Sequence, residues 1–191
     1  MAKSNETIVV LDFECFPMDM PVEIGALAYD ATSKSVKRFH QIISPDDDTM
    51  KGYSPLHWKT YAYIVQNIHG ISIDTATKMG MTSDFTTAKF AKWMSRLGSG
   101  IPDQLIVVAL QPEMENRVLS SWNDKLANTS FSSFPEVRDI LEEFDLEHYR
   151  QRDNRPHKLK QLSQRDHCHF HKRNTHCAAM DVSEQALWLG V

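Results

Sequence analysis

The sequence predicts an α/β fold in which a mixed sheet is flanked by helices. Three strand-like runs follow one another early in the chain with short connections, which is typical of an antiparallel meander. Later in the chain, a buried strand-like run lies between amphipathic helical segments, which favours helices packed against the same sheet. At 191 residues, we expect one domain that spans residues 1–191.

The first three strands are expected at residues 7–14, 21–30 and 35–43. The first begins with the run Thr7–Val10, rich in β-branched residues, and ends in the carboxylates of Asp12 and Glu14. A turn at residues 31–34 separates the second strand from the third. A Pro- and Asp-rich stretch, Ser44–Asp48, then ends the meander.

The rest of the chain alternates helices with one strand. Helices are expected at 56–66, 82–97, 112–124, 134–146 and 178–189, a strand at 104–110 and an irregular basic loop at 150–175. Thr82–Asp84 can cap a helix, and Pro112 suits a first helical turn.

Composition excludes several classes of protein. The net charge of −4 argues against a general binder of polyanions. No window of about 18 apolar residues predicts a membrane span, and the first residues lack the apolar core of a signal peptide. Three cysteines, an odd number, argue against a disulfide framework. We therefore expect an intracellular protein, cytoplasmic or nuclear.

Charge is unevenly distributed along the chain. Residues 136–147 hold six acids and one base, whereas residues 150–173 hold eight Lys or Arg. The asymmetry indicates either an ordinary solvated surface or a basic lip beside an acidic site.

Asp12 and Glu14 are two residues apart on a strand, so their side chains share one face. Such a pair suits hard divalent cations, although acids at strand ends are also common on ordinary surfaces. His176 and Asp181 follow with the spacing H-x4-D. If the last helix crosses the early strands, Asp181 completes a three-carboxylate site for two Mg²⁺ or Mn²⁺ ions, and His176 can act as general base.

A second cluster suits a softer metal. Cys168, His171 and Cys177 have the spacing C-x2-H-x5-C and supply three of the four ligands that a structural zinc needs. The fourth can come from His167, His169 or a carboxylate, and Glu23 is a candidate because it interrupts an apolar strand. The alternative is a solvated His-rich loop with unliganded cysteines.

The order of these motifs resembles the DEDDh 3′–5′ exonucleases of the RNase H-like superfamily. Matching segments are Asp12-Phe13-Glu14, Val22–Ala26, His69-Gly70-Ile71, His176 and Asp181. Glu115 stands where that family has a further Asp, and Leu110-Gln111 replace its His-Asn. Glu115 would then assist catalysis; otherwise it is an exposed helix acid.

Glu23 with Cys168, His171 and Cys177 also resembles the Glu-Cys-His-Cys zinc motif of the Maelstrom domain, a relative of these exonucleases. Together the resemblances imply a 3′–5′ exoribonuclease, a hydrolase acting on single-stranded RNA or DNA with RNA preferred, with a structural zinc. Candidate phosphate contacts are Lys158, Lys160, Arg165, Lys172 and Arg173.

Two alternatives to the nuclease remain open at this point. One is a non-catalytic, Maelstrom-type module that binds single-stranded RNA in small-RNA silencing. The other is a zinc-stabilised protein-interaction domain. The oligomeric state is not predicted.

Overall fold

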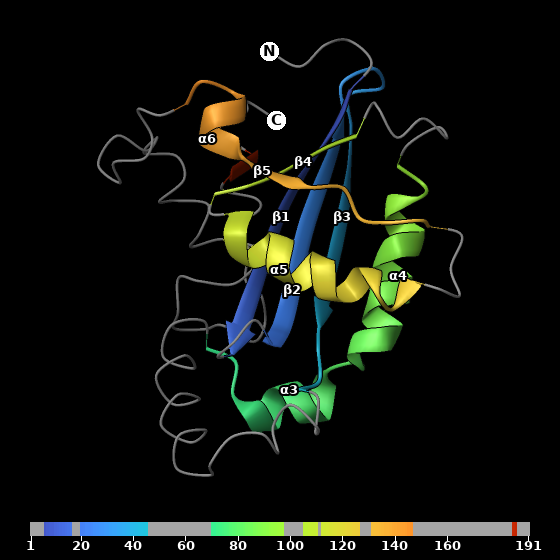
Figure 1. Cartoon of the computed structure of the whole chain (residues 1–191), viewed down its shortest axis with the longest axis vertical. Coiled ribbons are helices and arrows are strands. Elements are labelled where there is room, and N and C mark those ends of the chain that lie inside the picture. Colours follow the sequence, from blue (N-terminus) through green and yellow to red (C-terminus); the bar gives the residue numbers. More distant parts are fainter. Residues whose placement is uncertain are drawn as a thin grey trace.

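A five-stranded mixed sheet forms the centre of the protein (Figure 1). The computed structural model describes residues 6–16, 20–45, 70–97, 105–110, 112–126, 131–146 and 185–186. The strand order is β3-β2-β1-β4-β5. The predicted α/β fold class is therefore confirmed.

The first three strands form the predicted antiparallel meander. They are β1 (Thr7–Phe16), β2 (Met20–Asp30) and β3 (Ser35–Ile42). In the turn between β2 and β3, the Asp30 carboxylate accepts hydrogen bonds from the backbone N–H groups of Thr32 and Ser33 and from the Ser33 hydroxyl. These bonds hold the pKa of Asp30 below its usual value, with the Ser33 hydroxyl making the largest contribution.

Two parallel strands extend the sheet on the other side of β1. β4 (Leu105–Ala109) pairs with β1, and β5 (Val137–Asp139) pairs with β4. Helix α5 (Pro112–Asn123) begins at the proline that was predicted to open it. The helix predicted at 134–146 is wrong in its first half, because residues 137–139 join the open edge of β4 as a strand.

Helix α6 (Ile140–Glu143) follows β5 directly. Its N-cap is Asp139, whose carboxylate accepts a hydrogen bond from the Leu141 backbone N–H. The helical part of the predicted 134–146 segment is thus a single short turn.

Two helices lie between the meander and β4 in the described residues 70–97. They are α3 (Ile73–Met79), which the sequence did not predict, and α4 (Ser83–Met94), which was predicted with a later end. Between them, the Ser44 N–H donates to the Met81 carbonyl, and the Met81 N–H donates to the Ile42 carbonyl. Gly80 packs directly against the backbone of this region, since an added Cβ would overlap the backbone of Ser44, Ala76 and Ile43.

The predicted helix at 56–66 and the predicted loop at 150–175 lie outside the described residues. Of the predicted helix at 178–189, Gln185 and Ala186 are described, and both are helical. In the part of the chain that the structure describes, no helix is long and apolar enough to cross a membrane.

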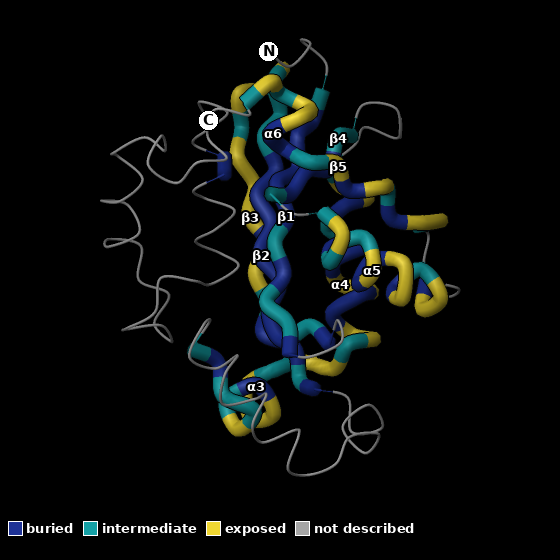
Figure 2. Tube along the Cα trace, turned by 60° about the vertical axis from the view of Figure 1, so that its left-hand side comes forward, coloured by how far each residue is buried: buried dark blue, intermediate teal, exposed yellow. Residues whose placement is uncertain are grey.

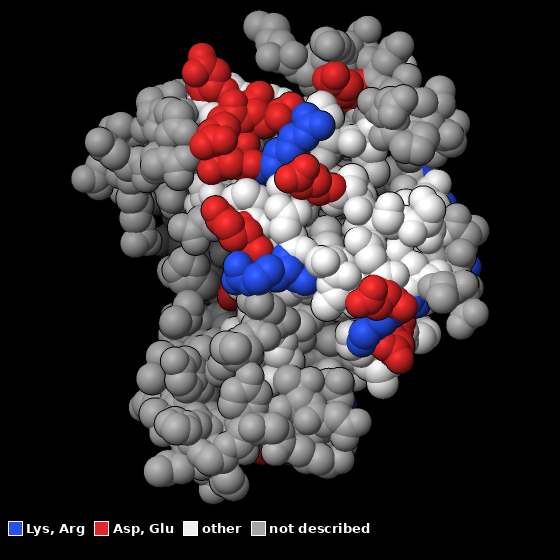
Figure 3. All heavy atoms as spheres, viewed as in Figure 1, with Lys and Arg blue, Asp and Glu red and all other residues white. Residues whose placement is uncertain are grey.

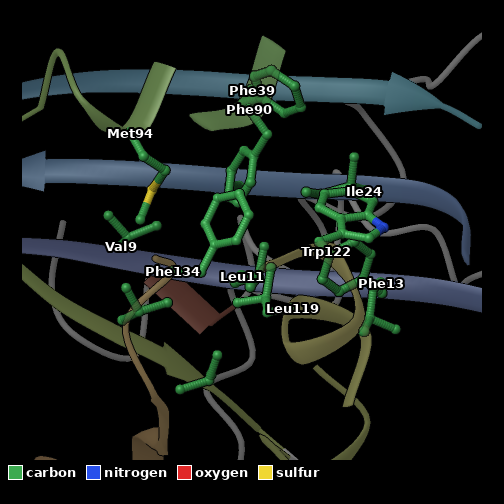
Figure 4. Close-up of a cluster of buried hydrophobic side chains, with 14 of the residues drawn as sticks. Val9, Leu11, Phe13, Ile24, Phe39, Phe90, Met94, Leu119, Trp122 and Phe134 are labelled. Atoms are coloured by element: carbon green, nitrogen blue, oxygen red, sulfur yellow. The ribbon is translucent and has the colours of Figure 1, made fainter. Parts of the chain in front are cut away.

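Alternation along β1 assigns its side chains to the two faces of the sheet. Val9, Leu11 and Phe13 belong to the main core with α4 and α5, which lie together on one side of the sheet (Figure 2). This core is aromatic: Trp122 meets Phe13 edge-on at 5.3 Å between ring centroids, and Phe90 and Phe134 fill the space beside it (Figure 4). Ile8 and Val10 pack on the opposite face.

Candidate active site

Strand β1 is longer than its parallel neighbour β4, and the candidate site lies along the excess length. The β1–β4 pairing begins at Thr7↔Leu105 and ends at Val10↔Val108, whereas β1 continues to Phe16. Asp12 and Glu14 therefore lie beyond the carboxyl end of β4. Polar side chains at such an end of a parallel strand are well placed to meet a ligand.

Asp12 and Glu14 occupy one face of this extension. Their partners on β2 are Gly25 and Glu23 respectively, so the carboxylate of Asp12 lies opposite a residue without a side chain. Both acids are partly exposed, whereas Phe13 between them is buried on the other face. The two-residue spacing thus places the carboxylates together, as the sequence indicates.

Glu115 approaches the same stretch of β1 from α5. It lies near the start of that helix and is 3% exposed, so it is not the surface acid of the alternative interpretation. The backbone N–H of Phe13 donates to its carboxyl group. Because β4 has already ended, we infer that this carboxyl takes the place of a strand partner for the extension of β1.

Burial sets the electrostatics of Glu115. Loss of water around the carboxyl raises the pKa of Glu115 to about 7, although hydrogen bonds from its own backbone N–H and that of Phe13 act in the opposite direction. Its Oε2 atom is buried and has no hydrogen-bond partner among the residues that the structure describes. A buried carboxylate oxygen with spare lone pairs is a suitable ligand for a hard cation.

Within the described ranges, no group of three or more His, Cys, Asp and Glu side chains is close enough to hold a metal ion. The donor chemistry nevertheless fits a hard cation, since Asp12, Glu14 and Glu115 all offer carboxylate oxygens along one strand extension. The predicted third ligand, Asp181, and the predicted base, His176, lie outside the described residues.

Helical residues just beyond Asp181 lie on the face of the sheet that carries Asp12. Ala186 is buried against Ile8, Val10 and Leu27, which belong to that face.

Glu23, the predicted fourth zinc ligand, is completely buried. Its Oε1 atom lies 2.6 Å from Nε2 of His40 on β3, a partner that the sequence did not reveal. The pairing depends on the register, in which Gly25 lies opposite His40. Cys168, His171 and Cys177 lie outside the described residues, as do His167 and His169, so the structure leaves the zinc site a prediction.

The candidate phosphate contacts, Lys158, Lys160, Arg165, Lys172 and Arg173, also lie outside the described residues. The acidic segment of the uneven charge distribution, residues 136–147, is described in the structure up to residue 146. Acidic side chains gather at the α6 end of the molecule in Figure 3, where Glu136, Glu142 and Asp145 are exposed. An ion pair between Arg138 and Glu143, at 3.0 Å, lies within this group.

Solved structures with a similar fold include exonucleases. Exonuclease I from Methylocaldum szegediense aligns with 95% of this chain at 14% identity and a TM-score of 0.60. Exonuclease I from E. coli, in complex with a dT13 oligonucleotide, aligns with 97% at 15% identity and a TM-score of 0.58. The chain spans 39% and 40% of these two proteins.

A third structure is similar over nearly its whole length. It is the nuclease domain of 3′hExo, a DEDDh family member bound to rAMP; the alignment covers 100% of this chain and 96% of that domain, at 15% identity and a TM-score of 0.57. No protein-family model matches the chain, and no curated protein matches it in sequence. These likenesses show that the chain has the RNase H-like fold of the exonucleases.

Proposed function

We propose that the protein is a metal-dependent 3′–5′ exonuclease that acts on single-stranded nucleic acid, with RNA as the preferred substrate. The observation that carries the proposal is that three acids, Asp12, Glu14 and Glu115, lie along the extension of β1. Asp12 and Glu14 share one face of this extension of β1. The buried carboxyl of Glu115 accepts a hydrogen bond from the backbone N–H of Phe13 in the same extension. The fold, which is similar to that of the nuclease domain of 3′hExo, a DEDDh family member, supports the proposal.

Asp12, Glu14 and Asp181 would hold two Mg²⁺ or Mn²⁺ ions, and Glu115 would assist them. When bound, such a pair supplies an activated water and stabilises the leaving oxygen of a phosphodiester. His176 would take the proton from the attacking water as general base. The position of Ala186 supports this arrangement, because this residue, five positions after Asp181, packs on the face of the sheet that carries Asp12.

The burial of Glu115 has a specific use in this reaction. In the absence of a cation, burial favours the protonated carboxyl, which avoids the cost of an unpaired buried charge. A divalent cation would favour the ionised form instead. The carboxyl would therefore carry its full negative charge when a cation is bound and would be partly protonated near pH 7 without one.

A structural zinc is part of the proposal. Glu23, Cys168, His171 and Cys177 would form a closed tetrahedral site, which does not activate water and so would stabilise the chain that carries His176. In the structure, Glu23 is buried and bonded to His40, so its carboxylate already lies away from solvent. Burial of this kind suits a ligand better than an ordinary surface acid.

The test uses single-stranded RNA and DNA of one sequence, labelled at either end, with the purified 191-residue chain. We expect nucleotide release from the 3′ end in Mn²⁺ or Mg²⁺, none in EDTA, and faster release from RNA. Asp12→Asn should reduce the rate by at least about 10²-fold. The matched control is Glu113→Gln, an exposed acid two residues before Glu115, which should leave the rate unchanged.

A folded protein that releases nothing in Mn²⁺, or an Asp12→Asn variant as active as the wild type, would overturn the nuclease. Tight binding of single-stranded RNA without release would favour the non-catalytic, Maelstrom-type module. Absence of binding at moderate salt would favour the protein-interaction domain.

A further inference from the structure

We propose that Asn116 is a positioning residue for this site: its side chain fastens the start of α5 to β5 and thereby holds the neighbouring Glu115 against β1. The expected effect on catalysis rests on the proposed nuclease function. The placement of Asn116 and Glu115 rests only on the hydrogen bonds that they make. Nothing in the sequence pattern marks Asn116, which is a half-buried residue in the middle of a helical segment.

Asn116 makes two hydrogen bonds to one residue of the sheet. Its Nδ2 donates to the Val137 carbonyl at 2.8 Å, and its Oδ1 accepts from the Val137 N–H at 2.8 Å. One amide side chain therefore satisfies both backbone polar groups of Val137. Two bonds in this arrangement restrain the position and the rotation of the helix at Asn116, whereas one bond would leave it free to pivot.

Glu115 is the adjacent residue on the helix and points to a different strand. Neighbouring residues of an α-helix are separated by about 100° around its axis and 1.5 Å along it. Asn116 reaches β5 while the carboxyl of Glu115 reaches the Phe13 N–H on β1, so the start of α5 is attached on both sides of the shorter β4. A helix that turned about its axis would lose both attachments together.

The same helix offers a matched control at its other end. Asn123, seven residues after Asn116 and on the same side of α5, accepts a hydrogen bond from the Phe134 N–H at 2.8 Å. It fastens the same segment, residues 134–137, but lies two turns away from Glu115. A variant at Asn123 therefore removes a comparable bond to the backbone without changing the start of the helix.

The first experiment measures native-state amide exchange by NMR in metal-free buffer, so it does not depend on nuclease activity. The reporters are the Phe13, Phe134 and Val137 amides, each compared with Val9 in the central part of β1 to correct for any change in global stability. In Asn116→Ala, we expect exchange of both Val137 and Phe13 to rise about tenfold or more, with Phe134 unchanged. In Asn123→Ala, Phe134 alone should rise.

Unchanged exchange at Phe13 in Asn116→Ala would overturn the proposal, because Glu115 would then keep its contact without Asn116. Should the alanine variant fail to fold, Asn116→Ser supplies the same comparison, since its hydroxyl can still reach Val137 through water while the two-bond restraint is lost.

The second experiment asks whether Asn116 acts through Glu115. Rates of Mn²⁺-dependent nucleotide release are compared in Asn116→Ala, Glu115→Gln and the double variant. We expect Asn116→Ala to slow the wild type about tenfold and to have little further effect in the Glu115→Gln background, while Asn123→Ala leaves the rate unchanged. Equal effects of Asn116→Ala in both backgrounds would contradict a positioning role. A wild type without activity would refute the nuclease and leave the exchange result to decide on Asn116.

Discussion

Glu115→Gln should make the metal-free protein more stable at pH 8 and should leave it nearly unchanged at pH 5. Glutamine has the shape of the protonated acid and carries no charge, so it reproduces the form that burial favours. Its Oε1 can still accept from the Phe13 N–H. The effect should therefore depend on pH in the range where the native carboxyl ionises.

The magnitude follows from the pKa shift. The carboxyl has a pKa of 4.5 in the unfolded chain and about 7 in the folded protein, so the folded state holds more protons between these values. Stability from this group is fully present below the unfolded pKa and is lost as pH rises through 7. At 1.36 kcal/mol for each pKa unit, the loss is on the order of 3 kcal/mol, or about 6 to 12 °C in Tm for a chain of this size.

The assay is thermal unfolding followed by circular dichroism in EDTA, at steps from pH 4.5 to 8.5. The informative quantity is the difference in Tm between Glu115→Gln and the wild type, because other titrating groups contribute equally to both. Glu113→Gln serves as the control and should give a difference that does not vary with pH. A difference that stayed flat for Glu115→Gln as well would refute the inference that this carboxyl is buried and prefers its neutral form.

Three further predictions concern substitutions at Gly80, Glu115 and Cys168. Gly80→Ala should destabilise by several kcal/mol or prevent folding, because its Cβ would overlap the backbone of Ser44, Ala76 and Ile43; chemical denaturation measures this. Glu115→Asp should lower both Mn²⁺-dependent activity and Tm, since the shorter acid loses the hydrogen bond from the Phe13 N–H; wild-type values of both would argue against this contact. Cys168→Ser should lower zinc content and Tm together, measured by elemental analysis and melting, and a zinc content well below one per chain in the wild type would discard the zinc site.

The sequence predicts the elements whose pattern is local. The β-branched run at the start of β1 and the two-residue spacing of Asp12 and Glu14 predict a strand with both acids on one face, and the register shows this arrangement. The proline at position 112 predicts the start of α5 correctly. In these cases, the physics that forms the element acts within a few residues of the chain.

The elements that the sequence misses depend on distant parts of the chain. Val137–Asp139 is too short to show the alternation of a strand and becomes one because β4 leaves an edge to pair with. Likewise, nothing near Glu115 predicts its burial. That burial arises because β4 ends before β1 does, so that α5 can approach the exposed backbone of the longer strand.

In the proposed nuclease, the position of α5 would explain why a glutamate stands where the DEDDh exonucleases that the sequence resembles have an aspartate. Asn116 holds the helix to Val137 through two bonds, so the distance from the helix to β1 is set by the fold rather than by the acid. Within that distance, the carboxyl of Glu115 reaches the Phe13 N–H. An aspartate is shorter by one methylene, about 1.5 Å, and would reach Phe13 only if the helix moved closer. Such a movement would strain the bonds to Val137. The side-chain length of Glu115 and the two hydrogen bonds of Asn116 therefore depend on each other. A change in either residue should be compensated by a change in the other.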